Sequence, residues 1–108
     1  MKRSQSHAML VAACLGYLAK RSIYAWPNPT RAVYDPKSGS WRKMRAGKGV
    51  SDILGQLRGY TILAVECKTG RDTLKPDQRA FRDGVEANGG LFILARCVAD
   101  LHEKIEEA

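Results

Sequence analysis

Two strand-like runs separated by one short turn constrain the fold of this chain most. Residues 50–57 read VSDILGQL and residues 60–68 read YTILAVECK, with Arg58–Gly59 between them. Apolar runs joined by a short glycine-containing segment predict an antiparallel hairpin. If the turn centres on Gly59, residues equally far from it along the two runs face each other. This register pairs Asp52 with Glu66.

The predicted hairpin brings three charged side chains together. Directly opposed residues of an antiparallel pair have Cβ atoms roughly 4.5–5.5 Å apart. Side chains alternate between the two faces of a strand, so Lys68 shares the face of Glu66. A register slip of one residue would turn Asp52 to the other face, so the prediction depends on the turn.

Two carboxylates and a lysine in one place indicate either a metal site or a surface acid–base pair. Neighbouring carboxylates repel unless one is protonated or a cation lies between them. Magnesium is bound through one or two carboxylates, water and substrate phosphate, and the backbone carbonyl of Cys67 could add a ligand. Lys68 could position or deprotonate a metal-activated water and stabilise developing negative charge. The spacing alone leaves a surface pair of little energetic value equally open.

The rest of the chain predicts a small α/β domain over residues 1–108. Apolar residues recur at helical spacing at the N-terminus, Pro76 suits the first turn of a helix, and Asn88-Gly89-Gly90 suits its end. The order is α-β-β-β-α-β-α, a small mixed sheet flanked by helices. Outside the hairpin, the expected elements are helices at 5–20, 76–88 and 98–108 and strands at 22–26 and 91–96.

Residues 31–49 are polar and basic, with six Lys or Arg against one acid, Asp35. They predict a mobile loop, with at most a weak strand at 31–34 or 40–44. The whole chain has 18 Lys and Arg against 11 Asp and Glu, a net charge of +7, which favours an anionic partner over a merely solvated loop. The candidate DNA contacts are Arg42, Lys43, Arg45, Lys48, Arg71 and Lys75.

Composition excludes some classes of protein. The three cysteines, Cys14, Cys67 and Cys97, lack the spacing of a metal knuckle, and we expect buried reduced thiols in a cytoplasmic protein. No apolar run approaches the ~20 residues that span a membrane. The basic and apolar N-terminus has the outline of a signal peptide, but its apolar residues fit a helix face better.

The string GKGVSDILGQLRGYTILAVECKTGRDTLKPDQRAF, residues 47–81, resembles the VRR-NUC family of the PD-(D/E)XK nuclease superfamily. GVSD before an apolar strand resembles the first family motif, VECK the E-x-K motif, and LKPDQRAF the start of the following helix. ANGGLFILARCVADL, residues 87–101, resembles the next strand and the closing helix. The resemblance covers about residues 7–105 and implies a restriction-endonuclease-like core.

This resemblance implies roles for individual residues. Asp52 and Glu66 would bind Mg²⁺ or Mn²⁺, Lys68 would be the catalytic lysine, and Gln78 would orient the site. Without the resemblance, Gln78 reads as a surface helix residue.

One departure from the family concerns the first helix. Many relatives carry a metal-binding glutamate there, whereas residues 2–21 contain no Asp or Glu. His7 could be a ligand instead or, as we favour, be solvated, which leaves open one metal or two.

Stand-alone relatives from phages and bacteria look like homodimers that cut branched DNA such as Holliday junctions. The resemblance therefore implies a metal-dependent DNA endonuclease that acts as a dimer. A dimer surface could lie around Tyr24, Trp26, Tyr34 or Trp41, although core packing favours Trp26 and loop anchoring Trp41. A non-catalytic nucleic-acid-binding module that retains the fold is the alternative, and RNA as the substrate stays open.

Overall fold

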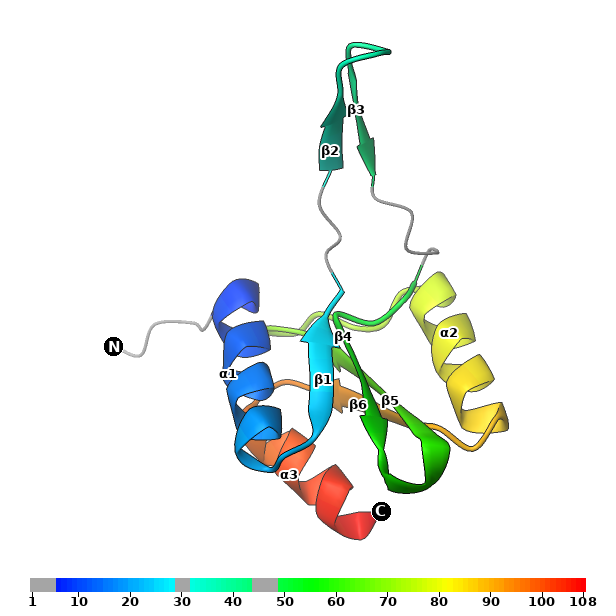
Figure 1. The fold of residues 1–108 in the computed structure, drawn as a ribbon. Helices are drawn as coiled ribbons and strands as arrows, with labels where there is room; N and C mark the ends of the chain where they lie inside the picture. Colours follow the sequence, from blue (N-terminus) through cyan, green and yellow to red (C-terminus); the bar gives the residue numbers. More distant parts are fainter. Residues whose placement is uncertain (1–5, 29–31, 44–48) are drawn as a thin grey trace.

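A computed structural model of the chain describes residues 6–28, 32–43 and 49–108, with only the backbone for 32–35 and 41–43. Its helices and strands follow the predicted order, with one additional hairpin (Figure 1). The elements are α1 (His7–Lys20), β1 (Tyr24–Pro27), β2 (Ala32–Asp35), β3 (Ser40–Lys43), β4 (Ile53–Leu57), η1 (Arg58–Tyr60), β5 (Thr61–Cys67), α2 (Pro76–Ala87), β6 (Leu91–Ala95) and α3 (Val98–Glu107).

The main sheet has four strands in the order β1-β4-β5-β6. The pairs β1–β4 and β4–β5 are antiparallel, whereas β5 and β6 are parallel. A parallel pair needs a crossover connection, and α2 provides it. The prediction of a small α/β fold with a mixed sheet between helices is therefore confirmed.

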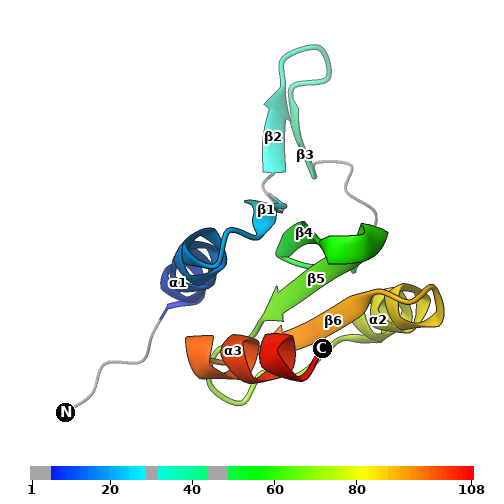
Figure 2. The same cartoon turned by 60° about the horizontal axis from the view of Figure 1, so that its bottom comes forward.

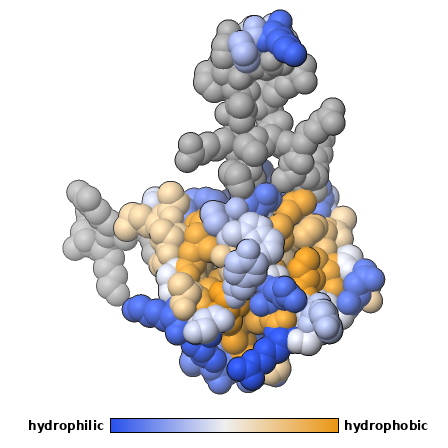
Figure 3. Space-filling model, in the orientation of Figure 1, coloured by the Kyte–Doolittle hydropathy of each residue, from blue (hydrophilic) through white to orange (hydrophobic). Residues whose placement is uncertain are grey.

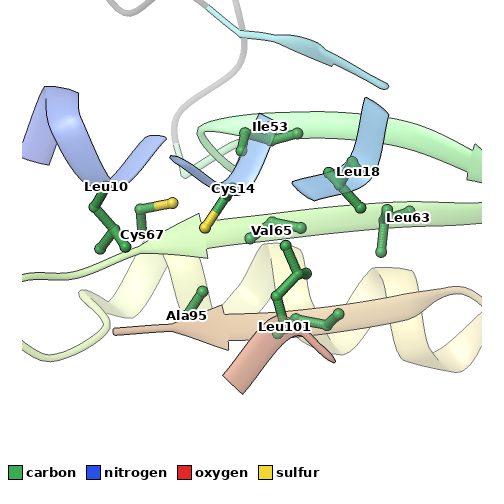
Figure 4. Close-up of a cluster of buried hydrophobic side chains, with 10 residues drawn as sticks. Leu10, Cys14, Leu18, Ile53, Leu63, Val65, Cys67, Ala95 and Leu101 are labelled. Atoms are coloured by element: carbon green, nitrogen blue, oxygen red, sulfur yellow. The ribbon is translucent and has the colours of Figure 1, made fainter. Parts of the chain in front are cut away.

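The two faces of the sheet are covered differently. On one face, Leu10, Cys14 and Leu18 of α1 and Leu101 of α3 pack against inward-facing strand residues such as Val65, forming a fully buried core (Figure 4). On the other face, α2 packs on β5 and β6. Figure 1 shows α1 and α2 on opposite sides of the strands, and Figure 2 shows the same arrangement from below. The site described below lies on the α2 face.

The predicted register of the central hairpin is confirmed. Ile53 pairs with Val65 and Leu57 with Thr61, as expected for a turn centred on Gly59. Gly59 has φ 76°, a left-handed conformation that glycine adopts without steric cost. The next opposed pair beyond Ile53 and Val65 is Asp52 and Glu66.

The prediction of a loop over residues 31–49 is wrong in part, whereas the weak strands expected at 31–34 or 40–44 are present as β2 and β3. The strands β2 and β3 form an antiparallel hairpin that pairs Asp35 with Ser40, and Figure 1 shows it projecting from the sheet near the end of β1. The reason is the intervening PKSG, in which Pro36 favours a turn and Gly39 takes φ 68°. Charged composition masked this turn signal. The remaining residues of the segment, 31 and 44–48, lie outside the described residues.

Two other expectations are corrected by exposure. Trp26 is 43% exposed rather than a core residue, because it belongs to the edge strand β1 and points away from the α1 core. Cys14 and Cys67 are buried as predicted, but Cys97 is exposed at the start of α3. Within the described residues, no helix is both long and apolar enough to cross a bilayer.

Candidate functional site

Asp52 is fixed at the start of β4 by backbone contacts on both sides. Its carbonyl accepts the Asn28 N–H at 2.7 Å, which extends the β1–β4 pairing by one step. Its carboxylate Oδ2 accepts the Cys67 N–H at 2.8 Å. Asp52 therefore reaches the end of β5, and the structure brings it next to Glu66 as the register requires.

Glu66 is a buried acid with one unused oxygen. The residue is 3% exposed, and Oε1 accepts a hydrogen bond from Gln78 Nε2 at 3.1 Å. The other oxygen, Oε2, is buried and has no hydrogen-bond partner in the structure. A buried carboxylate oxygen without a partner is costly unless a proton or a cation occupies its lone pairs.

Lys68 lies on the same face two residues further on. Its Nζ is 3.9 Å from Glu66 Oε1, and the residue is only 6% exposed. Its backbone N–H donates to the Ala95 carbonyl at 3.1 Å, which holds the end of β5 against β6. The predicted grouping of Asp52, Glu66 and Lys68 is thus present as geometry.

The pKa of Glu66 is raised from its ordinary value of 4.5 to about 8. Burial is the main cause, because it disfavours the charged form, and the nearby Asp52 charge adds to it. The Lys68 ammonium acts in the opposite direction but does not cancel them. Near neutral pH the isolated site therefore holds a proton on Glu66, which a bound cation would displace.

Gln78 connects the start of α2 to the site. Its Oε1 accepts the Lys75 N–H at 2.8 Å, and its Nε2 donates to Glu66, so both ends of the amide are engaged. The approach of α2 depends on Gly49, which has φ 81° and where a Cβ would overlap the Asp77 carbonyl. Gln78 is thus half-buried and contacts the site, unlike an ordinary surface helix residue.

His7 contacts Asp52 from the first turn of α1. The helix starts there because Ser6 Oγ accepts the Met9 N–H at 3.1 Å. His7 Nε2 lies 3.2 Å from Asp52 Oδ2, while its side chain stays 53% exposed. The residue is therefore half exposed and also hydrogen-bonded to the carboxylate that the resemblance assigns to the metal, so a ligand role for His7 stays a prediction.

No group of three or more His, Cys, Asp or Glu side chains suited to a metal ion occurs among the residues that the structure describes. The two carboxylates nevertheless fit a hard divalent cation that keeps water or phosphate as its other ligands. The unpartnered Glu66 Oε2 is the observation that supports this fit. Cys67 presents only its backbone to the site, because its thiol is buried in the core, where the neighbouring Cys14 and burial raise its pKa.

The predicted DNA contacts are partly described. Arg71 and Lys75 are exposed in the connection from β5 to α2, on the way from Lys68 to Gln78. Arg42 and Lys43 lie in β3, where only the backbone is described, and Arg45 and Lys48 lie outside the described residues.

Arg96 is a structural residue that the sequence did not indicate. Its guanidinium donates to the carbonyls of Gly70 at 3.0 Å and Asp72 at 2.7 Å. These bonds hold the turn that follows Lys68. An arginine after a strand carries no sequence signal for contacts with a loop 24 and 26 residues away.

Fold and site together define a small α/β protein in which the buried Glu66 and Lys68 and the partly exposed Asp52 lie at one end of a mixed sheet. Comparisons of the chain with models of protein families, with curated proteins and with solved structures found no match.

Proposed function

We propose that this protein is a divalent-metal-dependent endonuclease that hydrolyses DNA phosphodiester bonds. The single observation that carries the proposal is the buried, unpartnered Glu66 Oε2 beside Asp52 and Lys68. The resemblance of residues 47–81 to VRR-NUC nucleases assigns the same three residues to metal binding and catalysis. Branched DNA such as a Holliday junction is the proposed substrate, with Mg²⁺ or Mn²⁺ as the cofactor.

Asp52 and Glu66 would hold the metal. When bound, a divalent cation lowers the pKa of water and neutralises charge on the phosphate. The Cys67 N–H fixes the Asp52 carboxylate, and Gln78 fixes Glu66 through Oε1. This leaves Oε2 of Glu66 as the oxygen with spare lone pairs.

Lys68 would act on the substrate side of the acidic pair. A buried ammonium near the scissile phosphate stabilises negative charge that develops in the transition state. It would also position the attacking water. Gln78 would keep the Glu66 carboxylate in place as the phosphate approaches, because its amide is itself held by the Lys75 N–H.

The charge of the chain supports a nucleic-acid substrate. The net charge is +7, and basic residues of β3 and of the β5–α2 connection flank the site in sequence. Such contacts supply affinity for phosphates without reading bases. One chain carries one such site, so paired cuts in two strands require two copies, and we propose a homodimer.

The test uses labelled junction, flap and linear duplex DNA with Mg²⁺, with Mn²⁺ and with chelator. We expect metal-dependent cleavage that Glu66→Ala and Lys68→Ala abolish while circular dichroism stays native. Arg82→Ala is the matched control and should cleave normally, because this partly buried arginine of α2 pairs with Asp83 and not with the acidic pair. Absence of metal-dependent cleavage of every substrate would refute the nuclease.

A non-catalytic nucleic-acid-binding module is the second candidate. It is favoured by the lack of an acid in residues 2–21 and by the contact that His7 makes with Asp52. Calorimetry with Mn²⁺ separates the two functions. Stoichiometric binding that disappears in Asp52→Asn supports the enzyme, whereas binding of DNA without any binding of metal supports the module.

A further inference from the structure

Two exposed aromatic side chains lie on the same face of the sheet as the acidic pair. Tyr24 is 72% exposed and Trp26 is 43% exposed, although both belong to a strand of the main sheet. Their ring centroids are 5.3 Å apart, so they form one continuous aromatic surface. The intervening Ala25 points the other way and packs against the core.

The strand register places these rings in line with the site. Asn28 bonds to Asp52, which is opposite Glu66, whereas Trp26 pairs with Leu54 and Tyr24 with Gln56. Because side chains alternate, all of these residues share one face. At about 3.3 Å per residue, the Trp26 row is roughly 7 Å from the Asp52 row, and the Tyr24 row is roughly 13 Å from it.

The rings are exposed because α2 covers only half of this face. The helix packs on β5 and β6, close enough that a Cβ at Gly90 would lie 2.7 Å from Val85 Cγ1 and 2.5 Å from Ile62 Cγ2. Beyond Ile62, which is itself 44% exposed, the face is open over β4 and β1. Figure 3 shows exposed hydrophobic surface between the region of β1 and that of α2.

We propose that Tyr24 and Trp26 stack on unpaired bases of a nucleic-acid strand whose backbone passes over Asp52 and Glu66. The inference rests on the proposed function and specifies its substrate: a strand with unpaired nucleotides beside the bond that is cut. Aromatic side chains on an open sheet stack on bases without regard to sequence. The basic charge of the chain attracts the backbone of the same strand.

A second copy of the chain fits this surface less well. Aromatic side chains have areas of roughly 150–250 Å², so the exposed parts of Tyr24 and Trp26 total on the order of 200 Å². A stable interface needs about 800 Å² from each partner. A protein surface broad enough to supply the rest would also cover the neighbouring carboxylates and close the proposed site.

The experiment compares two oligomers that differ only in having bases. Fluorescence anisotropy measures the binding of a labelled thymidine oligomer and of an abasic oligomer of equal length, both in chelator. We expect wild-type protein to bind the thymidine oligomer at least about tenfold more tightly. Tyr24→Ala and Trp26→Ala should each lose about fivefold or more of this preference while binding of the abasic oligomer stays unchanged.

Ring-preserving variants keep the test decisive. Tyr24→Phe and Trp26→Phe should bind like wild type, and thermal melting should show that all four variants fold, since both side chains are exposed. Equal binding of the two oligomers by wild-type protein would overturn the inference. Alanine variants that weaken the binding of both oligomers equally would also overturn it. The same holds if the wild-type protein is a dimer that Trp26→Ala dissociates without changing the preference for bases.

The same assay separates this inference from the nuclease. Binding is measured without metal, so base preference is readable even if no substrate is ever cleaved. Cleavage without base preference would refute the stacking surface and leave the nuclease intact. Base preference without cleavage of any substrate would refute the nuclease and leave the stacking surface intact.

Discussion

Replacing Glu66 by glutamine should make the protein less sensitive to alkaline pH while removing the proposed metal site. The carboxyl has a pKa of about 8 in the folded chain against an ordinary value of 4.5. A folded-state pKa raised above the unfolded value means that the folded state holds the proton more tightly. Stability is therefore highest at acidic pH and is lost as pH rises between the two values.

The size of the effect follows from the two pKa values. Relative to protein in which Glu66 is protonated in both the folded and the unfolded state, ionisation of this group lowers the free energy of unfolding by about 4 kcal/mol at about pH 8. At about pH 5 it lowers it by about 1 kcal/mol. Wild-type protein should therefore lose about 3 kcal/mol over this interval through this one group. Glu66→Gln cannot ionise, so it should lack this loss and share the contributions of the other titrating groups.

Urea unfolding of both proteins at the two pH values gives the difference directly, because the cost of the substitution itself cancels. Saturating Mn²⁺ supplies the second arm: at about pH 8 it should stabilise wild-type protein by about 3 kcal/mol at a hundredfold excess over Kd, and leave Glu66→Gln unchanged. Identical pH dependence of the two proteins would show that Glu66 is solvated and ordinary. The reasoning about its burial would then fail.

Three further predictions concern how the site is held. Gly49→Ala should lower the free energy of unfolding by about 2 kcal/mol or more in urea, because its φ of 81° and the Asp77 carbonyl leave no room for a Cβ; a neutral effect would show that α2 is not pressed against this turn. His7→Ala should weaken Mn²⁺ binding in calorimetry about tenfold, whether the imidazole binds the metal or orients Asp52; unchanged affinity would make the contact incidental. Arg96→Ala should lower the free energy of unfolding by about 1 kcal/mol, because two exposed hydrogen bonds to the carbonyls of residues 70 and 72 are exchanged for water, and Arg96→Lys should restore only part of it; hydrogen exchange over that turn would be unaffected if the bonds do not matter.

The central hairpin was predictable because its register depends on local information. One glycine at the turn fixes which residues face each other, and this pairing is enough to place Asp52 against Glu66. The order of the remaining elements followed from periodicity and from signals such as Pro76. These features need no knowledge of how separate elements pack.

Several environments could not be worked out from local patterns because they depend on packing between distant elements. Gln78 contacts Glu66 because α2 starts beside the end of β5; the family resemblance implied a site role for this residue, but no local pattern within the helix indicates the approach. Trp26 is exposed because α2 stops short of β1, so the extent of one helix decides the environment of a residue fifty positions earlier. The β2–β3 hairpin was predicted only in part: weak strands at 31–34 or 40–44 were expected, but the charged composition hid the turn that pairs them.

The alternation of β5 separates stability from chemistry. Its residues 63, 65 and 67 belong to the core with α1 and α3, whereas residues 66 and 68 carry the acid and the lysine on the α2 face. Both sets of side chains are buried, so the sequence of β5 is an apolar run in which only Glu66 and the following Lys68 are charged. The helices α1 and α3 form a fully buried core on one face of the sheet. Because that core stabilises the fold, the other face can hold a buried carboxyl group with a raised pKa and leave aromatic side chains exposed beside it. Substitutions on the α2 face of β5 should therefore change binding and pH response far more than substitutions of the buried core residues beneath α1 and α3, which should change stability alone.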